Sequence, residues 1–263
     1  MYQSYKGLPE LRKGISEFYK THYQVVLDPN TEVLPLMGSK EGIMHISMAF
    51  LNPGDQVLIP NPGYPTYASV CRLLEAEPIF YSLSEVTNWQ PDFKELESLV
   101  TSKIKIMWVN YPHMPTGSDF DVNTLQRLIR WAKQNDILLV NDNPYSFVLT
   151  DKPQSILSLT DAKEIAIELN SLSKSFNMAG WRVGMLCGKA QTVQAVLKVK
   201  SNMDSGMFFG IQQGAIAALK METSWFKKLN EIYRRRRNLV EKLATRLETK
   251  FDPTSRGLFV WAR

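Results

Sequence analysis

Short apolar runs alternate with longer amphipathic segments along most of the 263-residue chain. Short, mostly apolar runs such as 104–109 and 137–140 are typical of buried strands. Segments 7–23 and 121–135 instead repeat their apolar residues every three or four positions, as a helix with one buried face does. The same reasoning predicts further strands at 32–37, 57–60, 78–81, 165–169 and 182–187, and further helices at 43–50, 65–74, 91–101, 188–200, 207–221 and 223–250 (one long helix or two in tandem).

Strands that alternate with helices imply a largely parallel sheet with helices on both faces. The predicted fold class is therefore α/β, a three-layer αβα sandwich with a mostly parallel central sheet. In such sheets, ligands bind beyond the carboxyl ends of the strands. Residues with useful chemistry follow five predicted strands, and we expect one crevice to collect them: Ser39, Tyr64, Asn110, Asp142 and Lys174.

Residues 171–184, Ser-Leu-Ser-Lys-Ser-Phe-Asn-Met-Ala-Gly-Trp-Arg-Val-Gly, place a lysine just after a predicted strand. A lysine held there is partly desolvated, and desolvation favours the neutral, nucleophilic amine. The hydroxyls of Ser171 and Ser173 and the guanidinium of Arg182 suit a phosphate dianion. A reactive amine beside a phosphate clamp matches the aldehyde and the phosphate of pyridoxal 5′-phosphate. The alternative is a surface Lys174 in a polar loop, because short motifs often match by chance.

A second anion site is predicted where Gly-Ser-Lys-Glu-Gly, residues 38–42, opens a helix. The backbone N–H groups of Ser39 and Lys40 lie at the positive end of the helix dipole, where a phosphate binds readily. The alternative interpretation is that Ser39 only caps the helix.

The ring of pyridoxal phosphate needs three further partners. A carboxylate keeps the pyridine nitrogen protonated, so that the ring accepts electrons, and Asp142 at the end of a predicted strand is the candidate. Tyr145 is the candidate donor to the phenolic oxygen, and Tyr64 is the candidate cover for the ring face. Taken singly, Asp142 also fits a turn-forming aspartate, and each tyrosine also fits a core or surface residue.

Composition and charge change this picture little. The formal charge of +5 is modest, and no basic run is interleaved with aromatic residues as in nucleic-acid binding proteins. The three histidines are scattered, so no metal site is expected, and Cys71 and Cys187 are expected to be buried free thiols. No apolar stretch approaches eighteen residues. We therefore expect a cytoplasmic protein that binds neither membranes nor nucleic acids.

Five motifs in a fixed order carry a resemblance to a known family. They are Gly-Ser-Lys-Glu-Gly, Asn-Pro-Gly-Tyr-Pro-x-Tyr, Pro-Thr-Gly, Asn-Asp-x-x-Tyr and Ser-x-Ser-Lys-x-x-x-x-x-Gly-x-Arg-x-Gly. Together they resemble the class I/II, fold type I aminotransferases over nearly the whole chain. The first two motifs are most similar to the branch with LL-diaminopimelate, alanine and aromatic aminotransferases.

The resemblance implies a role for each candidate residue. Lys174 holds pyridoxal phosphate as an internal aldimine and moves the proton between Cα and C4′. Asp142 pairs with the pyridinium, Tyr145 donates to the phenolate and Tyr64 stacks on the ring. Tyr2 matches the family tyrosine that reaches the phosphate of the neighbouring subunit, so the resemblance implies a homodimer. The remaining residues hold the phosphate: Ser39, Lys40, Ser171, Ser173 and Arg182.

One position departs from the family pattern in a way that bears on the cofactor. The family usually has Asn-Pro-Thr-Gly, whose Asn donates to the cofactor's phenolic oxygen, and Met114 occupies that position here. Because a thioether cannot donate, we predict a raised pKa for the internal aldimine. Asn110 or His113 is available to compensate, and the sequence leaves this open.

The length of the chain is the second departure. Family members usually start before Tyr2 and continue beyond the strand expected at 257–263, so the chain resembles a member truncated at both ends. Residues 1–240 are expected to form the cofactor-binding large domain, and residues 241–263 the start of a small domain that is largely missing. Arg263 does not match the family arginine that binds the substrate carboxylate, so we expect impaired activity.

Three functions are consistent with these observations. The first is an aminotransferase that moves an amino group between an amino acid and a 2-oxo acid. The second is a lyase with the same fold and lysine, such as a carbon–sulfur β-lyase or an aminocyclopropane-carboxylate synthase. The third is a non-catalytic remnant that binds the cofactor or a regulatory partner. The aminotransferase is the function that we expect.

Overall fold

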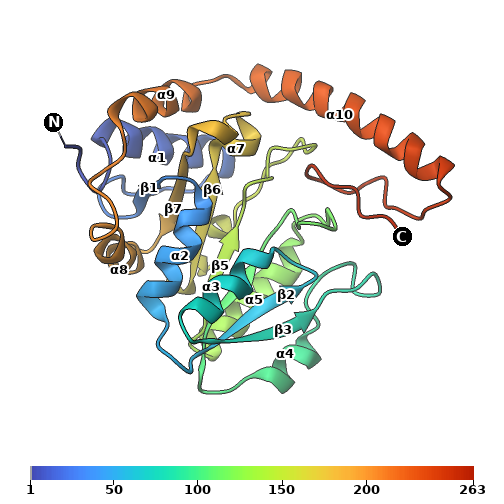
Figure 1. The fold of residues 1–263 in the computed structure, drawn as a ribbon, viewed down its shortest axis with the longest axis horizontal. Helices are drawn as coiled ribbons and strands as arrows, with labels where there is room; N and C mark the ends of the chain where they lie inside the picture. The colour runs from blue at the N-terminus through green and yellow to red at the C-terminus, as the bar shows by residue number, and fades with distance from the viewer. Residues whose placement is uncertain (1) are drawn as a thin grey trace.

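The computed structural model describes residues 2–263, and a seven-stranded sheet lies at its centre (Figure 1). Across the described residues, the strand order is β1-β7-β6-β5-β4-β2-β3. Each strand lies within a few residues of a predicted one, because short apolar runs pack well in a sheet that is buried on both faces. The strands are β1 Val33–Leu36, β2 Gln56–Asn61, β3 Glu77–Ser82, β4 Ile104–Val109, β5 Leu138–Asp142, β6 Ala166–Ser171 and β7 Gly184–Gly188.

Among the described strands, β7 runs against its neighbours. Strands β3, β2, β4, β5 and β6 pair in parallel, whereas β7 is antiparallel both to β6 and to β1. The chain leaves β6 at Ser171, turns back at the same edge of the sheet and enters β7 at Gly184. The Lys174 loop therefore stays at the edge where the parallel strands have their carboxyl ends. The expectation of a mostly parallel sheet is confirmed.

Helices cover both faces of the sheet. In β4, Met107 and Val109 join a core formed with α1, α4, α5 and α9, and the alternate residues Ile106 and Trp108 join a core formed with α2, α3 and α8. These two cores confirm the three-layer αβα sandwich. The helices are α1 Pro9–Tyr23, α2 Ser39–Phe50, α3 Pro65–Leu73, α4 Phe93–Leu99, α5 Val122–Gln134, α6 Ala162–Ile165, α7 Leu172–Ser175, α8 Ala190–Lys200, α9 Phe209–Leu219 and α10 Thr223–Arg246.

The last part of the chain departs from the sequence-based expectation. Helix α10 is one continuous helix that extends away from the sheet (Figure 1). The strand predicted at 257–263 is wrong: the only pairing there is an isolated antiparallel bridge between Phe251 and Ala262. A strand needs a neighbour for its backbone groups, and the described residues place no strand beside this segment. The predicted domain boundary near residue 240 falls inside α10, and the division into two domains stays a prediction.

The helices were also compared with the length and hydropathy of membrane-spanning helices. Within residues 2–263, no helix has the combination of length and apolar character that crossing a bilayer requires.

Candidate active site

A cavity of about 320 Å³ opens at the carboxyl ends of β4, β5 and β6, beside the first turn of α2. The crevice expected from the sequence therefore exists, and the loops after separate strands meet in it as parallel topology requires. Every candidate residue except Tyr2 lines it: Ser39, Lys40, Tyr64, Asp142, Tyr145, Ser171, Ser173, Lys174 and Arg182.

The first turn of α2 is free to bind an anion. Its N-cap position is Gly38, which has no side chain to bond to the first N–H groups, so the interpretation of Ser39 as a simple helix cap is wrong. The guanidinium of Arg182 packs directly over Gly38 and is held there by the carbonyl oxygen of Ala179, 2.9 Å from Nη1. Uncapped N–H groups at the positive end of a helix dipole, next to an arginine, form an anion site.

Two hydroxyls extend this polar wall toward the lysine. Ser171 Oγ donates to Ser173 Oγ at 2.9 Å, and Nη1 of Arg182 lies 3.5 Å from Ser173 Oγ. Lys174 follows in the single turn of α7, where its half-buried side chain lines the cavity. Its carbonyl oxygen accepts the phenol of Tyr233, a residue of α10, at 3.3 Å. The amine is thus placed beside the anion site, as the sequence predicted.

Asp142 presents one unpartnered oxygen. Its Oδ2 accepts the phenol of Tyr67 at 2.8 Å, but its Oδ1 is buried without a hydrogen-bond partner. Burial raises the pKa of Asp142 to about 6, against the opposing effect of the Tyr67 hydrogen bond. The ring of Tyr67 stacks on Trp108, with centroids 4.7 Å apart, which fixes the phenol. A buried carboxylate oxygen without a donor is the complement of a protonated ring nitrogen.

Two tyrosines line other walls of the cavity. Tyr145 is buried, and burial together with the nearby charge of Asp142 raises the pKa of its phenol, which therefore stays protonated as a donor at neutral pH. Tyr64 lies at the amino end of α3, and its ring meets Tyr67 edge-on with centroids 5.6 Å apart. Both tyrosines therefore line the cavity, and their roles as phenolic donor and aromatic cover stay predictions.

Asn110 and His113 are the two neighbours of Met114 that were candidates to supply the missing donor. Met114 lines the cavity, and its N–H donates to Asn110 Oδ1 at 2.8 Å. Nδ2 of Asn110, which also lines the cavity, donates one of its two hydrogens to the carbonyl oxygen of Asp142 at 2.5 Å. His113 is buried outside the cavity lining, and burial lowers its pKa to about 4, which keeps it neutral. His113 therefore does not replace the missing donor, and compensation by Asn110, which lines the cavity, stays a prediction.

Some lining residues were not singled out from the sequence. Tyr67 is the last residue of the motif Asn-Pro-Gly-Tyr-Pro-x-Tyr, so a signal for it was present. Phe259 was assigned to a strand of a second domain, yet it lines the cavity. Tyr2, by contrast, is 87% exposed and is not among the lining residues, so its role in a neighbouring subunit stays a prediction.

Comparison with known proteins identifies the family. The family model described as aminotransferase class I and II matches residues 1–263. The chain belongs to this family. LL-diaminopimelate aminotransferase of Aquifex aeolicus is 39% identical over 264 residues, which cover all of this chain and 68% of that protein. Apo-BacF from Bacillus subtilis matches with a TM-score of 0.96 at 38% identity, over all of this chain and 70% of that one. An aminotransferase from Staphylococcus aureus matches with a TM-score of 0.93 at 32% identity, again over all of this chain and 70% of that one.

Members of this family are aminotransferases that use pyridoxal phosphate, and the residues present fit that cofactor. The orphaned Oδ1 of Asp142 suits its protonated ring nitrogen, and the uncapped turn of α2 suits its phosphate. The expected fold, enzyme class and cofactor are thereby confirmed, including the resemblance to fold type I members.

Proposed function

We propose that this chain exchanges an amino group between an amino acid and a 2-oxo acid in the cavity around Lys174. The observation that carries this proposal is the convergence, in one cavity, of a lysine, an anion site and a buried carboxylate with a free oxygen. Each of these groups, taken alone, also occurs in proteins of unrelated function. Together they match the three parts of pyridoxal phosphate that the protein has to bind: the aldehyde, the phosphate and the ring nitrogen.

Each lining residue has a proposed task. Asp142 faces the ring nitrogen, Tyr145 donates to the phenolic oxygen and Tyr64 covers the ring. The phosphate is held by the backbone of the first turn of α2 and by side chains of the polar wall: Ser39, Lys40, Ser171, Ser173 and Arg182.

The chemistry divides between the cofactor and the chain. When bound, pyridoxal phosphate supplies an electron sink for the electrons left at the substrate Cα. The charge of Asp142 favours the protonated ring nitrogen on which this sink depends, because the carboxylate is buried and receives a single hydrogen bond from the described part of the chain. Lys174 takes the proton from the substrate Cα on its Nζ. Tyr64 and Phe259 limit the access of water to that proton.

The donor amino acid is proposed from the relatives. Curated relatives at 39–40% identity are named LL-diaminopimelate aminotransferases, so LL-diaminopimelate is the first donor to test. A solved structure at 38% identity has a different name, which makes a wider panel necessary. That panel includes glutamate, alanine and aromatic amino acids.

A homodimer is also proposed. Large apolar side chains are exposed around the start of α9 and the amino-terminal segment, namely Tyr2, Phe208 and Phe209. The two segments are adjacent, because the backbone of Gln3 lies against Gly206. Exposed apolar patches of this kind mark protein–protein contacts. The measurement is the mass in solution by sedimentation; a monomer at all concentrations contradicts the proposal. The cytoplasmic location and the division at residue 240 stay predictions.

The function is tested by a half-reaction. The visible spectrum of the purified chain is recorded with pyridoxal phosphate, before and after each amino acid. Conversion of the lysine-bound cofactor to pyridoxamine phosphate, with release of the 2-oxo acid, supports the proposal. Release of ammonia or a thiol instead indicates the lyase, and a band that no amino acid changes indicates a non-catalytic binding protein.

We predict that Gly38→Ala weakens the binding of pyridoxal phosphate about 100-fold. A Cβ at this position collides with the guanidinium of Arg182, and the φ of 90° is strained for alanine. Gly54→Ala is the matched control, because Gly54 has a φ of 83° but no atom within 4 Å of the added Cβ. Titration of the apo-protein with the cofactor measures both affinities. If Gly38→Ala and Gly54→Ala lose the same affinity for pyridoxal phosphate, the anion site at Gly38 is contradicted.

We predict that Met114→Asn lowers the pH at which the visible band of the lysine-bound cofactor titrates, by about one unit. The new amide restores a donor to the phenolic oxygen, where the chain otherwise offers Tyr145. Met114→Leu is the control, since it changes the side chain without adding a donor. Spectra recorded against pH give both values, and an unchanged titration in Met114→Asn overturns the prediction.

A further inference from the structure

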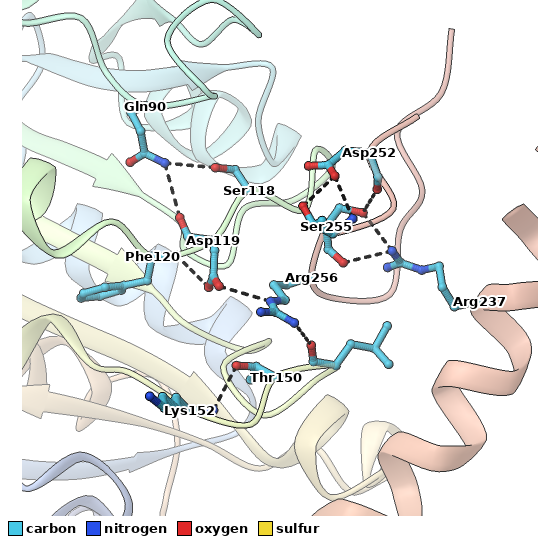
Figure 2. Close-up of polar contacts among 12 residues, drawn as sticks. Gln90, Ser118, Asp119, Phe120, Thr150, Lys152, Arg237, Asp252, Ser255 and Arg256 are labelled. Carbon is cyan, nitrogen blue, oxygen red and sulfur yellow. Dashed lines mark hydrogen bonds and ion pairs between the residues drawn. The ribbon is translucent and has the colours of Figure 1, made fainter. Parts of the chain in front are cut away.

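The C-terminal segment, defined here as residues 252–259, lies between α10 and the loops that follow β4 and β5 (Figure 2). Within the segment, Asp252 organises a turn: its Oδ1 accepts the N–H of Thr254, and its carbonyl oxygen accepts Oγ of Ser255. The segment contributes Phe259 to the active-site cavity, although it has no strand pairing to hold it in place.

Arg237 of α10 holds the segment from one side. Its guanidinium is buried, and it donates four hydrogen bonds, all of them to the segment; Figure 2 draws those to Ser255. Nη1 donates to the carbonyl oxygen and to Oγ of Ser255, at 3.1 and 2.9 Å. Nη2 donates to the carbonyl oxygens of Gly257 and Phe259, at 2.8 and 3.0 Å. No ion pair to Arg237 is present among the described residues, so its hydrogen bonds serve three backbone carbonyl oxygens and one hydroxyl of the segment.

Arg256 holds the segment from the other side. Its Nη1 donates to the carbonyl oxygen of Leu149 at 2.8 Å, and its Nε lies 3.2 Å from Oδ2 of Asp119 (Figure 2). The backbone adds two bonds: the N–H of Arg256 donates to Gly117 at 2.7 Å, and the N–H of Gly257 donates to Val148 at 3.2 Å. The two arginines thus attach one segment both to α10 and to the sheet domain.

The held segment packs against Tyr145. A Cβ added to Gly257 would lie 3.7 Å from Cγ of Tyr145, in van der Waals contact, and the ring of Phe259 meets that of Tyr145 edge-on with centroids 6.2 Å apart. Tyr233, one helical turn before Arg237, bonds to the carbonyl oxygen of Lys174. The same face of α10 therefore contacts both the segment and the lysine loop.

We propose that Arg237 is a positioning residue for the active site. It fixes Gly257 and Phe259 against Tyr145, and so fixes the direction of the phenol and the wall of the cavity beside it. This inference rests on the proposed function, because it assigns Arg237 an effect on the cofactor that Tyr145 is proposed to bind. Arg237 acts through the segment and does not line the active-site cavity.

The test uses Arg237→Met and Arg237→Lys, with Arg235→Met as the matched control. Arg235 is an exposed arginine of the same helix. Hydrogen exchange of the apo-protein measures the attachment itself at the N–H groups of Arg256 and Gly257. Pyridoxal phosphate affinity and the pH titration of the visible band measure the effect on the site. We expect Arg237→Met to exchange at least about tenfold faster at both amides, to bind the cofactor about tenfold more weakly and to titrate at a higher pH. We expect Arg237→Lys to give values between those of Arg237→Met and the unsubstituted chain. In the control, Arg235→Met, exchange, affinity and titration are expected to match those of the unsubstituted chain.

Phe259→Ala keeps the test decisive if Arg237→Met fails to fold. It removes the contact with Tyr145 from a side chain that is 43% exposed, and the same upward shift in titration is expected. Faster exchange without any change in affinity or titration overturns the inference, and so does unchanged exchange in Arg237→Lys and Arg237→Met. Failure of the proposed function looks different: the unsubstituted chain then shows no lysine-bound band, whatever the exchange results.

Discussion

Replacing Lys174 with alanine is expected to abolish the lysine-bound visible band and to slow the half-reaction by at least about 10⁴-fold. Lys174 lines the same cavity as the anion site and Asp142, so the loss removes both the proposed covalent attachment and the proposed base that receives the Cα proton. The fold should survive, because the side chain is only half-buried and its Nζ makes no hydrogen bond to another element within residues 2–263.

Lys40→Ala is the sharpest control for this prediction. Lys40 lines the same cavity, but its proposed contribution is a backbone N–H, which alanine retains. The measurement is reduction with borohydride in the presence of pyridoxal phosphate, followed by mass spectrometry of peptides. We expect the label on Lys174 in the unsubstituted chain and in Lys40→Ala, and none in Lys174→Ala. A label on Lys40, or a normal band in Lys174→Ala, contradicts the assignment.

The second large effect is expected from Asp142→Asn, which should slow the half-reaction about 10³-fold. Asparagine keeps the shape of the side chain and an acceptor for Tyr67, but it removes the charge that keeps the ring nitrogen protonated. Affinity for pyridoxal phosphate should also fall. The rate is measured in single turnovers with saturating cofactor, so that weaker binding and slower chemistry are separated. An exposed aspartate, Asp151, provides the control as Asp151→Asn.

The same substitution should stabilise the apo-protein at high pH. Burial raises the pKa of Asp142 from its ordinary 3.8 to about 6, so the folded apo-protein holds a proton that the unfolded chain releases. The free energy of unfolding therefore falls as the pH rises from about 4 to about 6, by about 3 kcal/mol in all. Asp142→Asn removes this loss. Urea unfolding at pH 4 and pH 8 measures this change in the free energy of unfolding. If Asp142→Asn and Asp151→Asn lose the same free energy between the two pH values, the raised pKa of Asp142 is contradicted.

The two predictions for Asp142→Asn show that the charge of Asp142 lowers the stability of the apo-protein and supports its proposed function. The buried Oδ1 of Asp142 has no donor in the protein alone, and leaving a charged atom in this state costs stability. Pyridoxal phosphate supplies the missing donor, so cofactor binding should relieve the cost. Tyr67, stacked on Trp108, directs the carboxylate and was identified only from the structure.

Where the sequence-based expectations failed, the reason is the lack of a local signal. The apolar run at 257–263 has the composition of a strand, but a strand forms only beside a partner, and the sheet ends elsewhere. The expected mostly parallel sheet is confirmed, but the sequence does not show which strand is reversed, because a strand has the same residue pattern in either direction. Ser39 resembled a helix cap because local sequence does not show that Gly38 occupies the cap position.

The sequence by itself determined the α/β class, the order of strands and helices along the chain, and the loops that carry Lys174, Asp142 and the anion site. These follow from hydrophobic periodicity and from motifs of neighbouring residues, both of which are local. Only the tertiary structure decided that Asp142 keeps a free oxygen, that Asn110 donates to the backbone of Asp142 and that Arg237 holds Phe259 in the cavity wall. These facts depend on contacts between residues that are distant along the chain, and such contacts exist only once the sheet and its helices have packed.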